Sequence, residues 1–222
     1  MITNQDYIYS IRKCYLFEGI EDEQLAEAIK LLNGRIKKIR KGEYIVELGG
    51  KMTRAGMLLK GKIETSFQNE NFDQITMHTF DGGYLFGEAL VINNAEHSPV
   101  QVRTVEDSIV LFIDLSAIYT VSDNSPIRMI LAENLIKSLA KKNFILNQKV
   151  RIFSQKSLRD RFYIYLSSLP KDKYGYVKIP FTQTALAEYL GVNRSALSRE
   201  LGRMQNEGVL EINGKKMKII AQ

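Results

Sequence analysis

Apolar residues in the last third of the chain recur at helical spacing, in two short segments separated by a glycine. The apolar positions of each segment share one face: Leu186, Ala187 and Leu190 in the first, and Ala196, Leu197, Leu201 and Met204 in the second. Thr182 and Asn193 stand where N-caps are expected, and Gly191 supplies the backbone freedom that a tight turn needs. The pattern predicts a helix-turn-helix.

The outward face of the second predicted helix is basic and hydroxylic. It carries Arg194, Ser195, Ser198, Arg199 and Arg203. A guanidinium group can bond bidentately to O6 and N7 of guanine, and hydroxyl groups bond bases or phosphates. This face therefore predicts base reading in double-stranded DNA. The alternative is an ordinary amphipathic helix pair whose basic face is only solvated.

A hairpin is predicted directly after these helices. Residues 209–212 alternate as a strand, Asn213-Gly214 is a strong turn signal, and residues 215–220 read as the return strand. Residues 176–179 could add a third strand. Such a two-stranded wing commonly meets the phosphate backbone, and its lysines are Lys215, Lys216 and Lys218. The unit is thus a predicted winged helix-turn-helix.

Charge supports a polyanionic partner for the same region. Residues 155–222 contain 12 Lys and Arg against 6 Asp and Glu, whereas the rest of the chain is balanced, so this region holds the whole net charge of +6. Basic side chains gain affinity by releasing counterions from phosphates. A membrane surface is the alternative polyanion, but the sequence predicts no amphipathic helix with a bulky apolar face that the hydrophobic core does not require.

The first half of the chain is patterned for strands rather than helices. After a helical stretch at 22–32, short β-type segments separated by glycine or Asn/Asp clusters occur at 37–40, 44–47, 55–59, 62–67, 74–80 and 108–113. Many short strands at regular spacing predict a sandwich or barrel. The fold class is therefore α+β.

The longest helical signal runs from Pro126 to about Phe153 without glycine or another proline. Its apolar positions approach a coiled-coil seam, with Leu131, Leu135, Leu139, Leu146 and Val150 as the expected dimerisation residues. A two-fold dimer would present two recognition helices to a pseudo-palindromic site. The alternative is a helix that lies across its own β-domain.

Composition narrows the class of protein further. The chain of 222 residues is 45% hydrophobic and 25% charged, which is ordinary for a globular protein of two domains, and it shows no signal peptide or membrane span, so we expect it in the cytoplasm. The single cysteine, Cys14, cannot form an internal disulfide or hold an iron–sulfur cluster; it fits a packed side chain better than a redox switch. No catalytic motif, metal site or cofactor is legible, so we do not expect an enzyme.

Together these features resemble the Crp/Fnr family of bacterial transcription regulators along nearly the whole chain. The glycine-marked segments at 40–50, 56–66 and 82–92 resemble that family's effector-binding β-roll, and 198–220 resembles its recognition helix and wing. The resemblance implies a jelly-roll-like double-stranded β-helix as effector domain (1–125), a dimerisation helix (126–154) and a DNA-binding domain (155–222). It also implies a small-molecule effector, a homodimer and, for an activator, RNA polymerase as a partner. Ser195 stands where the family usually has a glutamate.

The effector pocket departs from the cyclic-nucleotide binders of that family. Gly87 and Glu88 match the start of their phosphate cassette, in which the glutamate accepts a ribose hydroxyl. The arginine and serine that follow in those proteins are Ser98 and Pro99 here, so the phosphate loses its cation and one N–H donor. Cyclic AMP is therefore not the expected effector.

The remaining candidate effector residues come from the same resemblance. Leu146 and Asn147 replace the hydroxyl pair that meets the purine, and His78 aligns with an inward position of the roll. His78 could touch a ligand or even a haem, or it could be a histidine bonded only to backbone. A second interpretation of the whole chain is a receptor module that signals through protein contacts.

Overall fold

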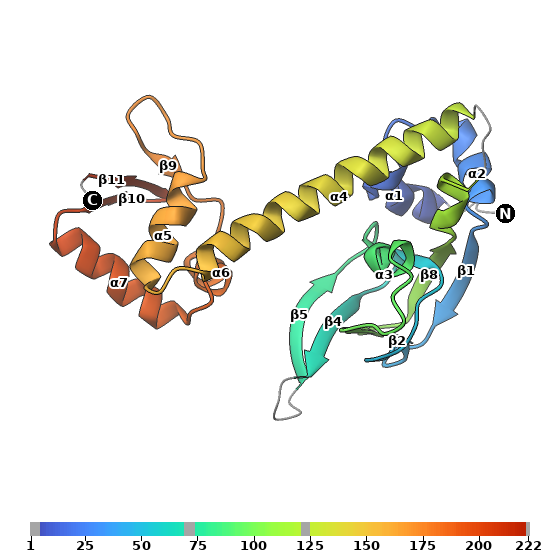
Figure 1. Ribbon diagram of the computed structural model, residues 1–222, viewed down its shortest axis with the longest axis horizontal. Helices are drawn as coiled ribbons and strands as arrows, with labels where there is room; N and C mark the ends of the chain where they lie inside the picture. Colours follow the sequence, from blue (N-terminus) through green and yellow to red (C-terminus); the bar gives the residue numbers. More distant parts are fainter. Residues whose placement is uncertain (1–4, 69–73, 121–124, 221–222) are drawn as a thin grey trace. The chain divides into compact units, whose positions relative to one another are not determined.

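The structure is a computed structural model that describes residues 5–68, 74–120 and 125–220. Close contacts divide the chain into two units, Met1–Leu139 and Ala140–Gln222. The division falls inside the long helix α4 (Pro126–Phe153), whose predicted bounds are confirmed (Figure 1). None of the described helices is long and apolar enough to cross a membrane.

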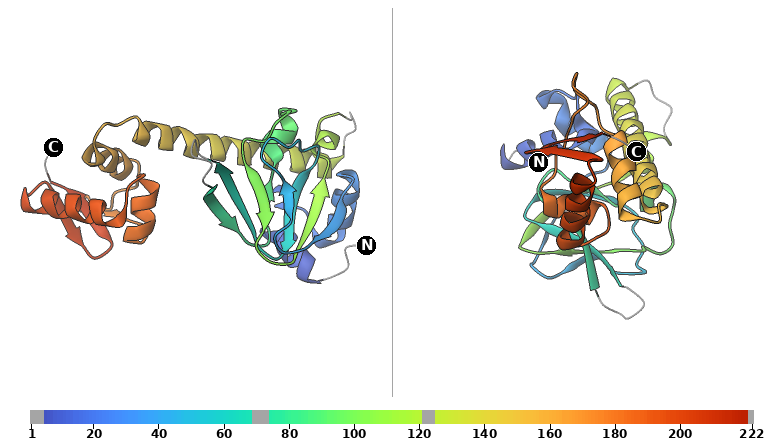
Figure 2. Two further views of the ribbon diagram at one scale, coloured as in Figure 1. Left: turned by 90° about the horizontal axis from the view of Figure 1, so that it is seen from below. Right: turned by 90° about the vertical axis from the view of Figure 1, so that its left-hand side faces the viewer.

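Two four-stranded antiparallel sheets frame the first unit, in the orders β1-β8-β3-β6 and β2-β7-β4-β5 (Figures 1 and 2). Their strands are β1 (Arg35–Ile39), β2 (Tyr44–Val46), β3 (Ala55–Lys60), β4 (Ile63–Gln68), β5 (Gln74–Phe80), β6 (Leu85–Phe86), β7 (Gln101–Thr104) and β8 (Ser108–Ile113). The predicted jelly-roll-like β-domain is confirmed. The sequence pattern missed β6 and β7, which are two and four residues long and too short for a clear period.

The sheet that contains β3 and β8 is buried on both faces. Leu58 and Val110 point into the core between the two sheets, whereas Met57 and Leu111 join the core beneath the helices. Because successive side chains of a strand face opposite ways, burial on both faces requires a continuous apolar run. Residues 55–59 are such a run, and all of them are buried.

Helices cover the outer face of that sheet. They are α1 (Gln5–Lys13), the 3₁₀ turn η1 (Tyr15–Phe17), α2 (Asp22–Leu31) and the first half of α4, with α3 (Glu88–Ile92) and η2 (Leu115–Ile118) between strands. The buried Asn134 amide ties α4 to this layer by donating to the carbonyls of Leu16 (3.1 Å) and Glu18 (2.7 Å). Cys14 is packed here at 1% exposure.

The first half of α4 corrects the predicted dimer seam. Leu131 and Leu135 are 0% and 6% exposed and belong to the core of the first unit, and Leu139 is partly buried against it. These leucines are spaced by four residues, so each lies about 40° further around the helix than the last. The apolar row therefore begins on the domain-facing side and only its later members, Leu146 and Val150, are exposed at 60% and 57%.

The second unit packs helices against a three-stranded sheet in the order β10-β11-β9 (Figure 1). Its elements are α5 (Leu158–Ser167), β9 (Val177–Lys178), α6 (Gln183–Tyr189), α7 (Arg194–Asn206), β10 (Leu210–Asn213) and β11 (Lys216–Ile219), with the second half of α4. Ile152 of α4 joins this unit's core beside Phe162 and Leu197. The expected third strand of the wing is confirmed as β9.

Candidate functional site

The helix-turn-helix is held by the capping residues that its sequence predicts. The Thr182 hydroxyl accepts from the N–H of Ala185 (3.2 Å), and the Asn193 side chain accepts from the N–H of Ala196 (2.8 Å). Gly191, at φ +72°, makes the turn between α6 and α7. Each cap satisfies an orphan donor of the first helical turn, so the angle between the two helices is fixed locally.

The outward face of α7 presents its basic and hydroxyl side chains to solvent. Arg194, Ser195, Ser198, Arg199 and Arg203 are all exposed. Ser195 is engaged locally, because its hydroxyl donates to the Oδ1 of Asn193 (2.8 Å). Within the described ranges, Arg194 and Arg199 have no acidic partner, so their guanidinium groups are available for a nucleic acid.

Two other arginines of this unit already have acidic partners. Arg159 of α5 bonds Glu200 of α7 (2.7 Å) and Glu207, the residue that caps the end of α7 (2.6 Å), and it holds the pKa of Glu207 below its usual range. Glu200 also forms an ion pair with Arg203, whose Nη1 lies 3.3 Å from the Glu200 Oε2. Arg159 was not a predicted site residue; nothing in its local pattern distinguishes it from a solvated arginine. Its role is to position α7.

The wing turns one residue later than its sequence suggests. Asn213 pairs with Lys216, so the two turn residues are Gly214 and Lys215, and Gly214 has φ +59°. Glycine at the first turn position fits a hairpin of the II′ kind. The predicted Asn213-Gly214 turn is thus wrong by one residue, because asparagine can still pair in the ladder while glycine alone takes the left-handed conformation.

The wing lysines differ in their surroundings. Lys215 is exposed at the tip and has no side-chain partner among the residues that the structure describes. Lys216 forms an ion pair with Asp172 (2.9 Å), which lowers the pKa of that carboxyl, and the Lys218 ammonium lies 5.5 Å from the Tyr176 ring centre. Lys215 is therefore the wing cation best placed for a phosphate.

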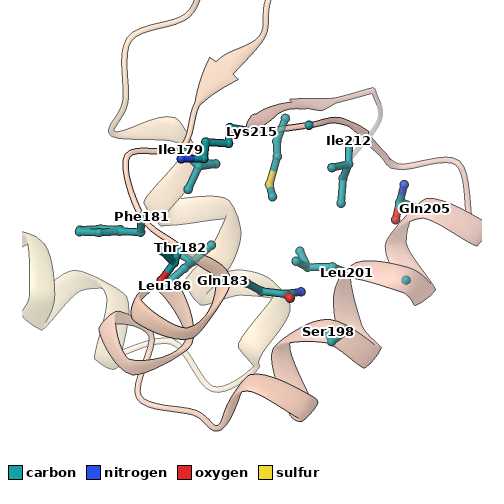
Figure 3. A pocket seen from close by; sticks show the side chains of 13 residues that line it. Ile179, Phe181, Thr182, Gln183, Leu186, Ser198, Leu201, Gln205, Ile212 and Lys215 are labelled. Carbon is teal, nitrogen blue, oxygen red and sulfur yellow. The ribbon is translucent and has the colours of Figure 1, made fainter.

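A groove of about 470 Å³ separates α7 from the wing and the start of α6 (Figure 3). Its floor is apolar, and its rim is polar. It is lined by Ile179, Phe181, Thr182, Gln183, Leu186, Ser198, Leu201, Gly202, Gln205, Ile212, Gly214, Lys215 and Met217. The predicted DNA-binding residues Ser198 and Lys215 thus meet across one concave surface, although they are distant in sequence.

The β-roll places the expected phosphate cassette at a sharp turn. Gly87 has φ +76° and precedes α3, whose first residue Glu88 is 5% exposed. This left-handed conformation favours glycine, and a Cβ here would also displace the end of the Met52 side chain, whose Cε lies 2.6 Å away. Burial, with the nearby charge of Glu88, raises the pKa of Tyr84 to about 12 and also raises that of Tyr15. The charge of Glu88 thus acts on two partly buried phenols, which the sequence did not indicate.

The positions that replace the phosphate-binding arginine and serine offer little to an anion. Ser98 is 3% exposed, its backbone N–H and C=O are bonded to Gly50 and Gly49, and its hydroxyl donates to the Val100 carbonyl. Pro99 is exposed and has no N–H. Arg103, the nearby basic alternative, is paired with Glu64 at 2.8 Å.

The remaining effector candidates lie in different units of the chain. His78 is exposed on β5, and its ring centre lies 5.8 Å from that of the partly buried Phe80. Leu146 and Asn147 are exposed on the part of α4 that belongs to the second unit. The described residues contain no group of three or more His, Cys, Asp or Glu that could hold a metal.

Comparisons with known proteins match both halves of the chain. The family model described as "Cyclic nucleotide-binding domain" matches residues 36–125, and "Crp-like helix-turn-helix domain" matches 160–221. Electron transport regulator A of Shewanella oneidensis is 24% identical over 90% of this chain and 79% of its own length. The Anaerobic regulatory protein of Pasteurella multocida is 22% identical over 89% and 73%.

The fold is shared with a solved structure. The Catabolite Activator Protein of Thermus thermophilus is similar with a TM-score of 0.56 and 20% identity, covering 92% of this chain and 93% of that one. An effector-type β-roll followed by a winged helix-turn-helix with a free basic face defines a DNA-binding transcription regulator. The chain belongs to the Crp/Fnr family of transcription regulators, a family of regulatory DNA-binding proteins rather than enzymes.

Proposed function

We propose that this protein is a homodimeric, sequence-specific regulator that responds to an effector other than a cyclic nucleotide. The observation that carries the DNA-binding part is the face of α7, on which Arg194 and Arg199 are exposed and unpaired beside the wing within the described chain. The excess of basic residues in the same region adds the sequence-independent affinity.

Two classes of DNA contact are expected from this surface. Arg194 and Arg199 reach base edges in the major groove, with Ser198 beside them, whereas Lys215 meets the phosphate backbone from the wing. Arg203 and Lys216 contribute less, since each already has a carboxylate partner. If the protein activates transcription, RNA polymerase is a further partner.

The effector part rests on the lost phosphate site. An anionic phosphate in this roll would face a buried Ser98, a proline and an arginine bound to Glu64, so it would lack charge-assisted bonds. A smaller or more apolar effector is favoured, with Glu88 as the buried polar group that could orient it.

A binding experiment with a selected operator tests the proposal. Fragments of genomic DNA retained by the full chain define the half-site, and fluorescence anisotropy then compares Arg199→Ala with Arg203→Ala. We expect Arg199→Ala to cost about 1–3 kcal/mol on the operator and far less on random DNA, and Arg203→Ala to cost less. An equal loss on both DNAs would assign Arg199 to phosphate. No DNA retention at low salt would instead favour a receptor module that signals through protein contacts.

A further inference from the structure

A further cavity of the second unit takes no part in the DNA contacts described above. It measures about 280 Å³ and lies where the second half of α4 meets the end of α5 and the residues around α6 (Figure 1). It is lined by Phe144, Ile145, Gln148, Tyr165, Ser168, Leu169, Pro180, Phe181 and Tyr189. Four of these nine side chains are aromatic, and none is charged. Such a lining suits a flat apolar group.

The aromatic side chains at this cavity form one cluster. The ring centres of Tyr165, Phe181 and Tyr189 lie 5.3 to 6.2 Å apart, within the range of favourable aromatic pairs. Phe144 stands at the rim and is 64% exposed. The free protein therefore leaves aromatic surface uncovered beside a packed aromatic cluster. A ligand ring that enters the cavity would extend the same contacts.

The Tyr165 hydroxyl is a buried donor without an acceptor. The residue is 2% exposed, and its hydroxyl has no hydrogen-bond partner among the residues that the structure describes. The neighbouring Ser168 hydroxyl does not serve, because it donates to the Tyr165 backbone carbonyl at 2.7 Å. A buried unpaired donor costs stability, whereas phenylalanine fills nearly the same space without that cost. An occupant of the cavity can supply the missing acceptor.

Charge beside the cavity favours a negative acceptor. The Lys149 ammonium lies 5.6 Å from the centre of the Tyr189 ring, and no acidic side chain in the described part of the chain pairs with it. Tyr165 adjoins the same ring, at 5.4 Å between ring centres. Aromatic rings also bind cations, but a cationic ligand would meet Lys149 as a like charge. A carboxylate gains from both the lysine and the phenol.

We propose that this cavity binds a small aromatic carboxylate. The ligand ring packs among Phe144, Phe181 and Tyr189. Its carboxylate accepts from the Tyr165 hydroxyl and lies toward the Lys149 ammonium. Because the hydroxyl is enclosed in the free protein, a rim side chain must move to admit the ligand, and the exposed Phe144 has the least packing to lose. The ligand links α4 to α6, so this is a ligand site within the DNA-binding unit, additional to the effector site proposed for the β-roll.

Calorimetric titration of the full chain with 2-naphthoate tests this site. The wild type is expected to bind with a Kd below about 1 mM. It should bind 2-naphthamide, which has the same shape and no charge, about tenfold more weakly, and it should not bind choline.

Four variants locate the binding. Tyr165→Phe should weaken 2-naphthoate binding about tenfold, because the carboxylate loses a donor. Lys149→Gln should weaken it about threefold, because a partly exposed ion pair is screened by solvent. The matched controls are Tyr163→Phe on the same helix and Lys156→Gln. Neither residue lines the cavity, so both variants should keep the wild-type affinity.

Thermal unfolding separates a ligand-binding hydroxyl from a purely structural one. Without ligand, Tyr165→Phe should raise Tm, and 2-naphthoate should then raise the Tm of the wild type more than that of the variant. A Tyr165→Phe chain that is less stable than the wild type and binds 2-naphthoate equally well would mean that the hydroxyl is paired with a trapped water, and this overturns the proposal. Absence of binding at about 1 mM, or tighter binding of choline than of 2-naphthoate, overturns it as well.

Discussion

Two glycines near the end of the recognition helix α7 provide a matched test. It separates the effect of backbone conformation on stability from the effect of the groove on DNA affinity. Gly202 lies inside α7, and Gly208 follows the helix with φ +72°. A Cβ built at either position meets nothing within 4 Å. Replacing each by alanine therefore adds the same methyl group to open space, so only the backbone conformation distinguishes the two changes in the free protein.

The expected changes in stability have opposite signs. Alanine in a helix interior is favoured over glycine by about 0.5–1 kcal/mol, so Gly202→Ala should stabilise the second unit. Alanine in the left-handed conformation costs about 1–2 kcal/mol, so Gly208→Ala should destabilise it. For a unit of this size, 1 kcal/mol corresponds to a shift of about 4–8 °C in Tm, and calorimetry resolves both.

DNA affinity should rank the two variants in the opposite order: the stabilised Gly202→Ala should bind DNA more weakly than Gly208→Ala. Gly202 lines the groove between α7 and the wing, and a glycine that the fold does not require suggests close approach by a ligand. If the DNA backbone enters this groove, Gly202→Ala should weaken binding to operator and random DNA alike, by about tenfold, while Gly208→Ala leaves affinity for the folded protein unchanged. A destabilised Gly202→Ala, or a stabilised Gly208→Ala, would refute the reasoning about backbone. Unchanged DNA affinity would refute the reasoning about the groove.

Further predictions concern the wing, a buried phenol and the effector. Lys215→Ala should lower the salt dependence of DNA binding by about one counterion, and Lys216→Ala by less, because Asp172 already pairs with Lys216; equal slopes would contradict this. The buried Tyr165 hydroxyl has no partner among the described residues, so Tyr165→Phe should stabilise by about 1 kcal/mol at neutral pH. Burial and then the charge of Tyr189 raise the pKa of Tyr165 to about 12. Because the unfolded chain loses this proton near pH 10 and the folded protein only near pH 12, stability is unaffected below pH 10 and falls as pH rises through about 12; Tyr165→Phe should abolish this part of the alkaline loss. Calorimetric titration with cyclic AMP and cyclic GMP should show no specific binding up to about 1 mM, where only about 4 kcal/mol is supplied; micromolar binding would mean that Arg103 leaves Glu64 for the phosphate.

Local sequence signals located the DNA-binding unit well because its determinants are local. Thr182, Asn193 and Gly191 act on their own helices, and the exposed arginines follow from a period of 3.6 residues. The wing was found for the same reason and misplaced by only one residue. Its flanking strands pair with near neighbours in sequence, so little tertiary information was needed.

The apolar row of α4 shows what local sequence signals cannot predict. The sequence determined a long helix, a basic winged helix-turn-helix and a β-rich domain, because periodicity, caps and turns are properties of adjacent residues. It could not say which apolar side of α4 is already used, because Leu131 and Leu135 join a core that includes residues from the start of the chain, such as Leu16 and Phe17. The same limit applies to Arg103 with Glu64 and to Arg159 with its two glutamates. Only the tertiary structure decides which charged side chains are paired and which apolar faces are buried within the chain. The charges and faces that remain exposed define what the protein can bind.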